Sequence, residues 1–294
     1  MLGHKLYEKL QNEFEVWTTL RSDFEKYRKI GLFDPERVLQ NVDVESEQAI
    51  SEAVAQVKPD VIINAAGIIK QVPTSKNVIK TLNVNSIFPH RLAELAKTAQ
   101  ARLITVSTDC VFSGKKGNYA ESDAADALDL YGRSKWLGEV QAENCLTIRT
   151  SIIGRELDTT HSLIEWFLSQ KGKTIKGYVN ATYTGFPTVV LSELIGEIIK
   201  NHPALEGLYH VSTEPISKYE MLCMIRDELE LDIEIEPFED FFMDRSLRGE
   251  RFAAATGLNM PDWKTLIRRF AADPFPYERI RNILMNQSHA GSPS

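Results

Sequence analysis

Cysteine is scarce in this chain, with three residues among 294, and the three are far apart. Cys110, Cys145 and Cys223 can neither form a disulfide framework nor provide a zinc site with its usual spacing. We expect small buried thiols in a reducing cytosol. No apolar run approaches the roughly 20 residues of a membrane span, and no signal peptide is visible. These absences predict a cytoplasmic protein with no membrane partner.

Basic residues are fewer than acidic ones. Lys and Arg together number 34 against 41 Asp and Glu, which gives a net charge of −7. An acidic chain without a basic cluster argues against nucleic acid or an anionic membrane surface as partner. Hydrophobic residues at 43% and charged residues at 26% are ordinary for a globular protein, so a fibrous or disordered chain is excluded.

The start of the chain has little glycine. Residues 1–4 run directly into a helical pattern marked by Leu6 and Leu10. A doubly wound nucleotide-binding fold opens with a strand and a glycine-rich turn, and only Gly3 stands where the last glycine of such a turn would lie. We therefore expect the chain as given to bind a dinucleotide weakly.

Apolar segments alternate with amphipathic ones along the chain. Strands are predicted over 14–18, 60–66, 102–107, 146–153 and 207–212, and helices over 48–57, 84–99, 130–143, 189–201, 218–230 and 261–272. Near-continuous apolar strands separated by helices indicate a parallel sheet covered on both faces. The predicted fold class is α/β, a doubly wound (Rossmann-like) parallel sheet whose ligands bind beyond the carboxyl ends of the strands.

One helix carries a pair with catalytic potential. Tyr131 and Lys135 are four residues apart, so both side chains lie on one face. A neighbouring ammonium lowers the pKa of a phenol, which suits the tyrosine to general acid/base work. We expect this effect here. The alternative is a solvated helix face, because the spacing alone is not specific.

Polar or small residues follow three predicted strands. Thr108 ends one strand and can donate a hydrogen bond to a substrate oxygen, or it can simply cap the next loop. The small residues 65–67 let a ligand approach the backbone closely, unless they form an ordinary strand exit. Asp43 can accept from an adenine amino group, or it can belong to the start of the 48–57 helix.

These pieces are parts of longer motifs. They are DV (43–44), NAAG (64–67), VN (84–85), STDCVFSG (107–114), GNYAESD (117–123), YGRSKWLGE (131–139), IRTSIIG (148–154), FPTVVLSELI (186–195) and GLYHVS (207–212). In this order they resemble the extended short-chain dehydrogenase/reductase family, over most of the chain. STD-x-VF followed by YG-x-SK-x-x-GE is far more specific than Y-x-x-x-K alone, and within the family it resembles the reductases of nucleotide-linked sugars.

The resemblance implies a division of the chain and an activity. A dinucleotide-binding domain is expected over 1–153 plus about 184–201, a smaller C-terminal substrate-binding domain over about 154–183 and 202–285, and a disordered tail over 286–294. The implied reaction is NAD(P)H-dependent reduction of the 4-keto group of a nucleotide-linked 6-deoxysugar. Thr108 would orient the ketone oxygen, Tyr131 would protonate it, and Lys135 would hold the nicotinamide ribose.

The resemblance also implies two sets of binding residues. The cofactor, NADPH or NADH, would contact Gly3, Arg21, Asp43, Val44, Ala65, Ala66, Gly67, Asn85, Tyr131, Lys135, Thr150 and Ile152. The nucleotide-sugar substrate would contact Asp109, Val111, Ser151 and Arg245. A guanidinium at Arg21 can pair with a 2′-phosphate, which favours NADPH. No metal site is predicted, and a second copy of the chain, in a homodimer, is a candidate partner.

Two other functions stay open. The first is a non-catalytic regulatory or binding subunit on the same fold, because fold does not decide function. The second is a sugar-nucleotide epimerase or dehydratase, which would use residues beside the threonine, here Asp109 and Cys110. After Gly67 the sequence reads IIKQ (68–71), which departs from the rhamnose reductases and leaves the sugar undefined.

Overall fold

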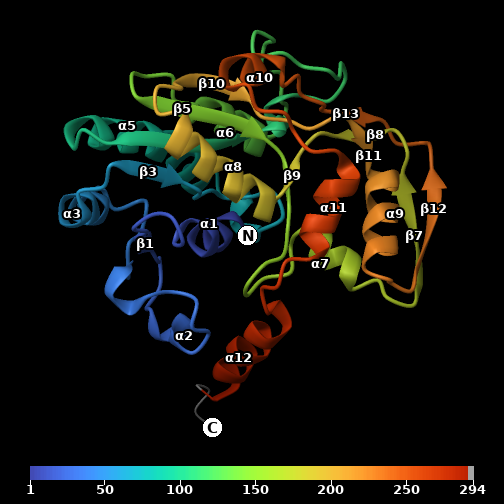
Figure 1. The fold of residues 1–294 in the computed structure, drawn as a ribbon, viewed down its shortest axis with the longest axis horizontal. Helices are drawn as coiled ribbons and strands as arrows, with labels where there is room; N and C mark the ends of the chain where they lie inside the picture. Colours follow the sequence, from blue (N-terminus) through green and yellow to red (C-terminus); the bar gives the residue numbers. More distant parts are fainter. Residues whose placement is uncertain (291–294) are drawn as a thin grey trace.

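The computed structural model describes residues 1–290 and is organised around a four-stranded sheet (Figure 1). The strand order is β10-β5-β4-β3, and each neighbouring pair is parallel. The strands are β3 (Val61–Asn64), β4 (Arg102–Thr108), β5 (Cys145–Thr150) and β10 (Gly207–His210). This confirms the predicted α/β class, with its parallel sheet.

Helices cover both faces of the sheet. They are α1 (Leu2–Leu10) and α8 (Thr188–Asn201) on one face, and α3 (Glu47–Val57) and α5 (Phe88–Thr98) on the other. Ile104 and Leu146 pack on the first face, and Leu103 and Cys145 on the second. Because successive strand residues point to opposite faces, an unbroken apolar strand fills two cores at once.

A separate two-stranded sheet follows α1. It pairs β1 (Thr18–Thr19) with β2 (Val38–Leu39), and between them lie α2 (Glu25–Arg28) and the 3₁₀ helix η1 (Pro35–Arg37). The strand predicted over 14–18 is therefore shorter and later. The amide of Phe14 donates to the Leu10 carbonyl, which uses that residue to close α1. Within the described residues β3 is paired on one side only, with β4.

The strand predicted over 146–153 is divided at Ser151. β5 stays in the main sheet, whereas β6 (Ile152–Ile153) pairs with β9 (Phe186–Pro187). The remaining strands form two small sheets: β11 (Ile216–Ser217), β8 (Ala181–Tyr183) and β13 (Met243–Asp244) in one, and β12 (Ile233–Phe238) and β7 (Lys173–Tyr178) in the other. They lie together beyond one end of the main sheet (Figure 1). The division into two domains stays a prediction.

Local signals set most helix boundaries. The other helices are α4 (Val78–Leu82), the π-helical turn η3 (Asn83–Ile87), α6 (Leu130–Leu137), α7 (Leu163–Leu168), α9 (Lys218–Glu228), α10 (Glu250–Thr256) and α11 (Trp263–Ala271), with 3₁₀ turns η2 (Pro73–Lys76) and η4 (Asp109–Val111). Ser217 and Glu220 form the predicted capping box. The helix predicted from 261 begins later, because Asp262 caps it by accepting from the Thr265 amide at 2.7 Å.

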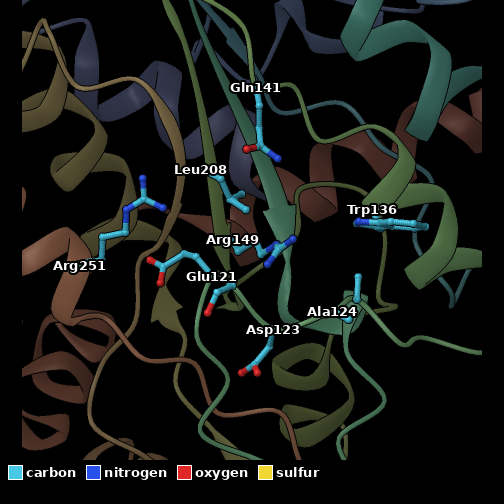
Figure 2. Close-up of a pocket in the computed structure, with 10 residues that line it drawn as sticks. Glu121, Asp123, Ala124, Trp136, Gln141, Arg149, Leu208 and Arg251 are labelled. Atoms are coloured by element: carbon cyan, nitrogen blue, oxygen red, sulfur yellow. The ribbon is translucent and has the colours of Figure 1, made fainter.

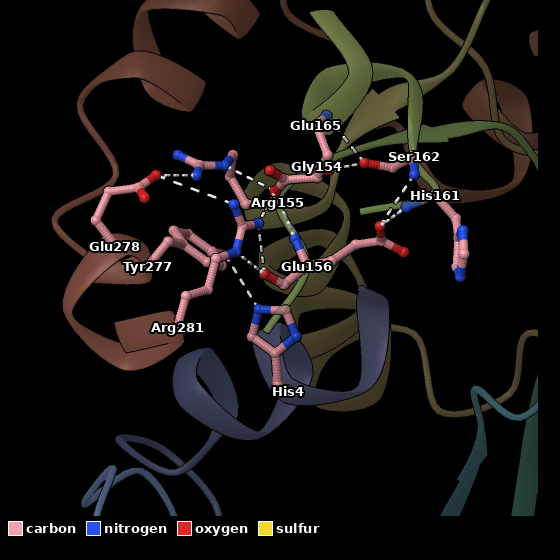
Figure 3. A network of polar contacts seen from close by, with 10 residues as sticks. All are labelled: His4, Gly154, Arg155, Glu156, His161, Ser162, Glu165, Tyr277, Glu278 and Arg281. Atoms are coloured by element: carbon pink, nitrogen blue, oxygen red, sulfur yellow. Dashed lines mark hydrogen bonds and ion pairs between the residues drawn. The ribbon is translucent and has the colours of Figure 1, made fainter. Parts of the chain in front are cut away.

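The last helix, α12 (Tyr277–Ala290), lies against α2 and the loop after β6. Arg281 pairs with Glu165 and donates to the Glu156 carbonyl at 2.8 Å, and Arg155 pairs with Glu165 and with Glu278 (Figure 3). Of the tail predicted to be disordered, 286–290 continue α12, because one face of this helix is anchored to the loop. Residues 291–294 lie outside the described part of the chain. No helix among the described residues is long and apolar enough to cross a membrane.

Candidate active site

Tyr131 and Lys135 lie on α6, which begins at the carboxyl edge of the main sheet. Asp129 sets the start of this helix, because its carboxylate accepts from the Gly132 amide at 2.8 Å. Asp129 also pairs with Lys70 at 2.7 Å, and the Lys70 ammonium lies 5.5 Å from the centre of the Tyr131 ring. The cap thus positions the tyrosine, and a cation lies over its ring. Sequence reasoning missed both Asp129 and Lys70, although D-L-Y-G has N-cap spacing.

Lys135 is turned toward the sheet. Its ammonium donates to the Val106 carbonyl of β4 at 2.7 Å, and the side chain is buried. Burial lowers the pKa of Lys135 to about 8, and the carboxylate of Glu139 acts in the opposite direction. The ammonium is therefore charged at neutral pH, but it can release its proton far more easily than a surface lysine.

The expected effect of Lys135 on Tyr131 is wrong for the described structure. The pKa of Tyr131 is raised, first by burial and then by the acidic groups of Cys110, Asp109 and Asp129. The hydroxyl of Thr108 opposes the rise. Lys135, whose ammonium donates to the Val106 carbonyl, is not among the groups that lower the pKa. The phenol therefore keeps its proton across the physiological pH range, as a proton donor requires.

Thr108 ends β4 beside Tyr131 and takes part in the turn that follows. Its hydroxyl donates to Asp109 Oδ1 at 3.0 Å and accepts from the Cys110 amide at 3.1 Å. The residue thus caps η4, as one of the two sequence interpretations expected, and its oxygen also faces the phenol. Burial raises the pKa of the Cys110 thiol to about 11, so this cysteine is no thiolate nucleophile.

Asn85 connects the segment that follows residues 65–67 to helix α6. Its Oδ1 accepts from the Ile68 amide at 2.8 Å, and its Nδ2 donates to the Ile68 carbonyl and to Ser134 Oγ. Because both amide hydrogens are used, Asn85 positions the segment rather than offering a free donor. Gly138 permits the close approach, since a Cβ there would lie 1.9 Å from the Asn85 carbonyl oxygen. The predicted helix over 130–143 accordingly ends at Leu137.

The other residues predicted to bind cofactor follow the carboxyl ends of several strands. Ala65, Ala66 and Gly67 are exposed after β3, Asp43 and Val44 are half-buried after β2, and Thr150 and Ile152 flank Ser151. Arg21 is exposed after β1, and no ion pair holds it among the described residues. Around Gly3 at the start of α1, a Cβ would meet nothing within 4 Å. A chain of exposed backbone and one uncommitted guanidinium is a donor set that fits a dinucleotide.

The four residues predicted to bind substrate differ in their surroundings. The side chain of Val111 is fully buried in a cluster with Phe112, Tyr119 and Leu247, so it is not accessible to a substrate in this structure. Asp109 and Ser151 lie next to Thr108 and Thr150, at the carboxyl ends of β4 and β5. Arg245 donates to the Phe112 carbonyl at 2.9 Å and to Cys110 Sγ at 3.4 Å, so it braces the turn that carries Thr108.

A buried ionic network lies behind the site, and the sequence analysis did not predict it. Glu139 accepts from Arg149 at 2.7 and 2.6 Å and from Ser107 Oγ at 2.7 Å. Arg149 also contacts His210 Nε2 at 3.2 Å, and His210 Nδ1 lies 3.0 Å from the Tyr119 carbonyl. Burial, followed by the charge of Arg149, lowers the pKa of His210 to about 3, so the ring is neutral. Nε2 then accepts and Nδ1 donates.

A pocket opens beside this network (Figure 2). Its lining includes Trp136, Gln141, Arg149, Leu208 and Arg251, with the acidic loop that contains Glu121 and Asp123. Neither Tyr131 nor Lys135 lines this pocket. The chemically competent groups lie instead at the carboxyl ends of β4 and β5, where parallel sheets bind ligands. No cluster of metal-ligating side chains occurs among residues 1–290.

A parallel α/β sheet with a Y-x-x-x-K helix at its carboxyl edge and a threonine on the adjoining strand defines the extended short-chain dehydrogenase/reductase class. Within this class, the family model described as "RmlD substrate binding domain" matches residues 1–273, and the chain belongs to this family.

Three known proteins are similar to this chain. The dTDP-4-dehydrorhamnose reductase of Aggregatibacter actinomycetemcomitans is 31% identical over 199 residues, which cover 64% of this chain and 67% of that protein. Methionine adenosyltransferase 2 subunit beta of Danio rerio is 26% identical over 246 residues, 79% of this chain and 72% of the relative. The solved dTDP-4-dehydrorhamnose reductase of Bacillus anthracis, in complex with NADP, has a TM-score of 0.70 at 20% identity and covers 87% of this chain and 99% of that one.

Proposed function

We propose that this chain reduces the 4-keto group of a nucleotide-linked 6-deoxysugar, as a dTDP-4-dehydrorhamnose reductase does. One arrangement carries the proposal: Tyr131, half-buried on α6, lies beside the Thr108 hydroxyl at the end of β4, with Lys135 one helical turn away. Family membership and the reductase relatives support the substrate class. The arrangement supports ketone reduction, because the phenol lies where it can give its proton to an oxygen that Thr108 orients.

Each residue of the site has a distinct part in this reaction. NAD(P)H, when bound, supplies the hydride to the ketone carbon. Thr108 turns its hydroxyl from Asp109 to the ketone oxygen and orients it. Tyr131 gives its proton to the same oxygen as negative charge develops there. Lys135, which donates to the Val106 carbonyl in this structure, would hold the ribose hydroxyls of the cofactor, and its charge would stabilise the tyrosinate that remains.

The residues that would hold the dinucleotide fit that group at both ends. Asp43 and Val44 would contact the adenine, and Arg21 would pair with a 2′-phosphate. Lys135 and Ile152 would lie beside the nicotinamide riboside. The Bacillus anthracis relative was solved with NADP, which supports this class of cofactor.

The test is Tyr131→Phe, measured by NADPH oxidation with dTDP-4-dehydrorhamnose. Loss of general acid catalysis should lower kcat by about 10²–10⁴-fold, with an unchanged circular dichroism spectrum. The exposed Tyr178→Phe is the matched control and should retain full activity. A kcat for Tyr131→Phe within a few-fold of wild type would refute the role of Tyr131.

A second function stays open, because relatives of a different kind also match the chain. Relatives named methionine adenosyltransferase 2 subunit beta match 79% of this chain, the same share as the dTDP-4-dehydrorhamnose reductase of Salmonella typhimurium. A subunit on this fold would bind a partner protein and have no turnover of its own. The same assay separates the two functions, because a wild-type chain that binds NADPH but reduces no ketosugar would favour the subunit.

A further inference from the structure

Large apolar side chains lie exposed on and around α6. Leu128, just before the helix, is 73% exposed, Trp136 is 47% and Leu137 51% exposed, and Ile87 at the end of η3 is exposed too. His90 Nε2 contacts the Leu137 carbonyl oxygen at 2.8 Å, which holds the end of η3 close to the end of α6. These four apolar side chains form the α6 patch. Single exposed apolar residues are ordinary, but a contiguous patch of them marks an interaction site.

A hollow of about 460 Å³ opens in the α6 patch. Apolar side chains line most of it, among them Ala125, Ala127, Trp136 and Leu137. Leu128 belongs to the same lining, yet most of its side chain projects into solvent. The surface thus carries a projecting apolar side chain and an apolar recess side by side. Two copies of such a surface can fill each other, because each supplies what the other lacks.

Two exposed charged side chains also line the hollow, one of each sign. Asp126 accepts from the amide and the hydroxyl of Ser113, and Arg133 donates to the Ala127 carbonyl at 3.1 Å. The pKa of Asp126 is lowered: burial opposes the shift, the hydrogen bonds from Ser113 produce it, and the charge of Lys115 adds to it. The carboxylate is therefore ionised. Among residues 1–290, neither Asp126 nor Arg133 forms an ion pair, so both charges are available to a partner.

We propose that two copies of this chain pack against each other through the α6 patch, about a two-fold axis. Such an axis sets a residue of one copy against a second residue of the other, and the reverse pair forms at the same time. Leu128 of each copy enters the hollow of the other, and Arg133 of each pairs with Asp126 of the other. Lys135 on the same helix is turned toward the sheet, so the second copy covers the opposite face of α6. The proposal goes beyond the reductase function and does not depend on it.

The first test is sedimentation velocity of the full chain, over concentrations from about 0.5 to 50 µM, where interfaces of moderate affinity dissociate. Wild type should sediment as a dimer at the upper end. Leu128→Glu should raise the dimer Kd at least about 100-fold, because two leucines lose their burial and two carboxylates enter apolar hollows. The matched control is Phe242→Glu, which changes a similarly exposed side chain before β13 and should leave the Kd within about 2-fold. Circular dichroism spectra of both variants should match that of wild type.

Charge reversal tests the two-fold geometry itself. In Arg133→Asp two carboxylates meet at each cross-axis pair, and in Asp126→Arg two guanidiniums meet, so each variant alone should be monomeric throughout this range. An equimolar mixture of the two variants should form a heterodimer, because both cross-axis pairs are again of opposite sign. The proposal is overturned by a wild type that is monomeric at every concentration, by a Leu128→Glu variant that dimerises as the control does, or by a mixture that does not associate. A chain that stays monomeric but binds a different protein through the α6 patch overturns it as well.

Discussion

The ion pair between Glu139 and Arg149 should be the most costly polar contact to break near the active site. The two side chains are 3% and 4% exposed, and two short contacts join them. Removing one partner of such a pair leaves an uncompensated buried charge, which costs about 3–5 kcal/mol. In Glu139→Ala, Ser107 also loses its acceptor. At about 2–4 °C per kcal/mol, the Tm of Glu139→Ala should fall by roughly 6–20 °C.

The measurement is differential scanning calorimetry of Glu139→Ala, Arg149→Met and the double variant Glu139→Leu/Arg149→Met. The double variant should recover much of the loss, because it buries no unpaired charge. The control is Glu25→Ala, which removes an exposed pair with Arg28 on α2 and should shift the Tm by at most about 2 °C. If Glu139→Ala shifts the Tm no more than this control, the network contributes little, and the burial argument is refuted.

Two further predictions concern cofactor choice and acid stability. Arg21→Ala should raise the KM for NADPH about 10-fold and leave that for NADH unchanged, because the exposed guanidinium would pair with the 2′-phosphate; equal effects on both cofactors would contradict this. His210 is buried and neutral, with a pKa of about 3, so the unfolded chain binds a proton that the folded chain refuses. Stability present above pH 6.5 should be lost as the pH falls toward 3, by about 2 kcal/mol at pH 5. Urea unfolding at pH 7 and pH 5 measures this loss, and an unchanged pH dependence in His210→Gln would assign it to other groups.

Much of the fold could be predicted because its signals are local. Apolar runs placed β3, β4, β5 and β10 to within a few residues, and the stripe 84–99 placed α5. The capping box at Ser217 and Glu220 needs only four consecutive residues, so it was predictable without any tertiary contact. The Tyr131–Lys135 spacing likewise put two side chains on one helix face. Periodicity and capping are properties of a short segment, which a sequence contains in full.

The burial, contacts and pKa values of the site residues depend on tertiary packing. Val111 is buried because Phe112, Tyr119 and Leu247 meet around it. Lys135 binds a carbonyl of β4, and the pKa of Tyr131 is raised first by burial and then by acidic groups on η4. The spacing of four residues could therefore not predict the sign of the shift. Burial and electrostatics are set by which distant segments exclude water from a group, and that is decided when the elements pack.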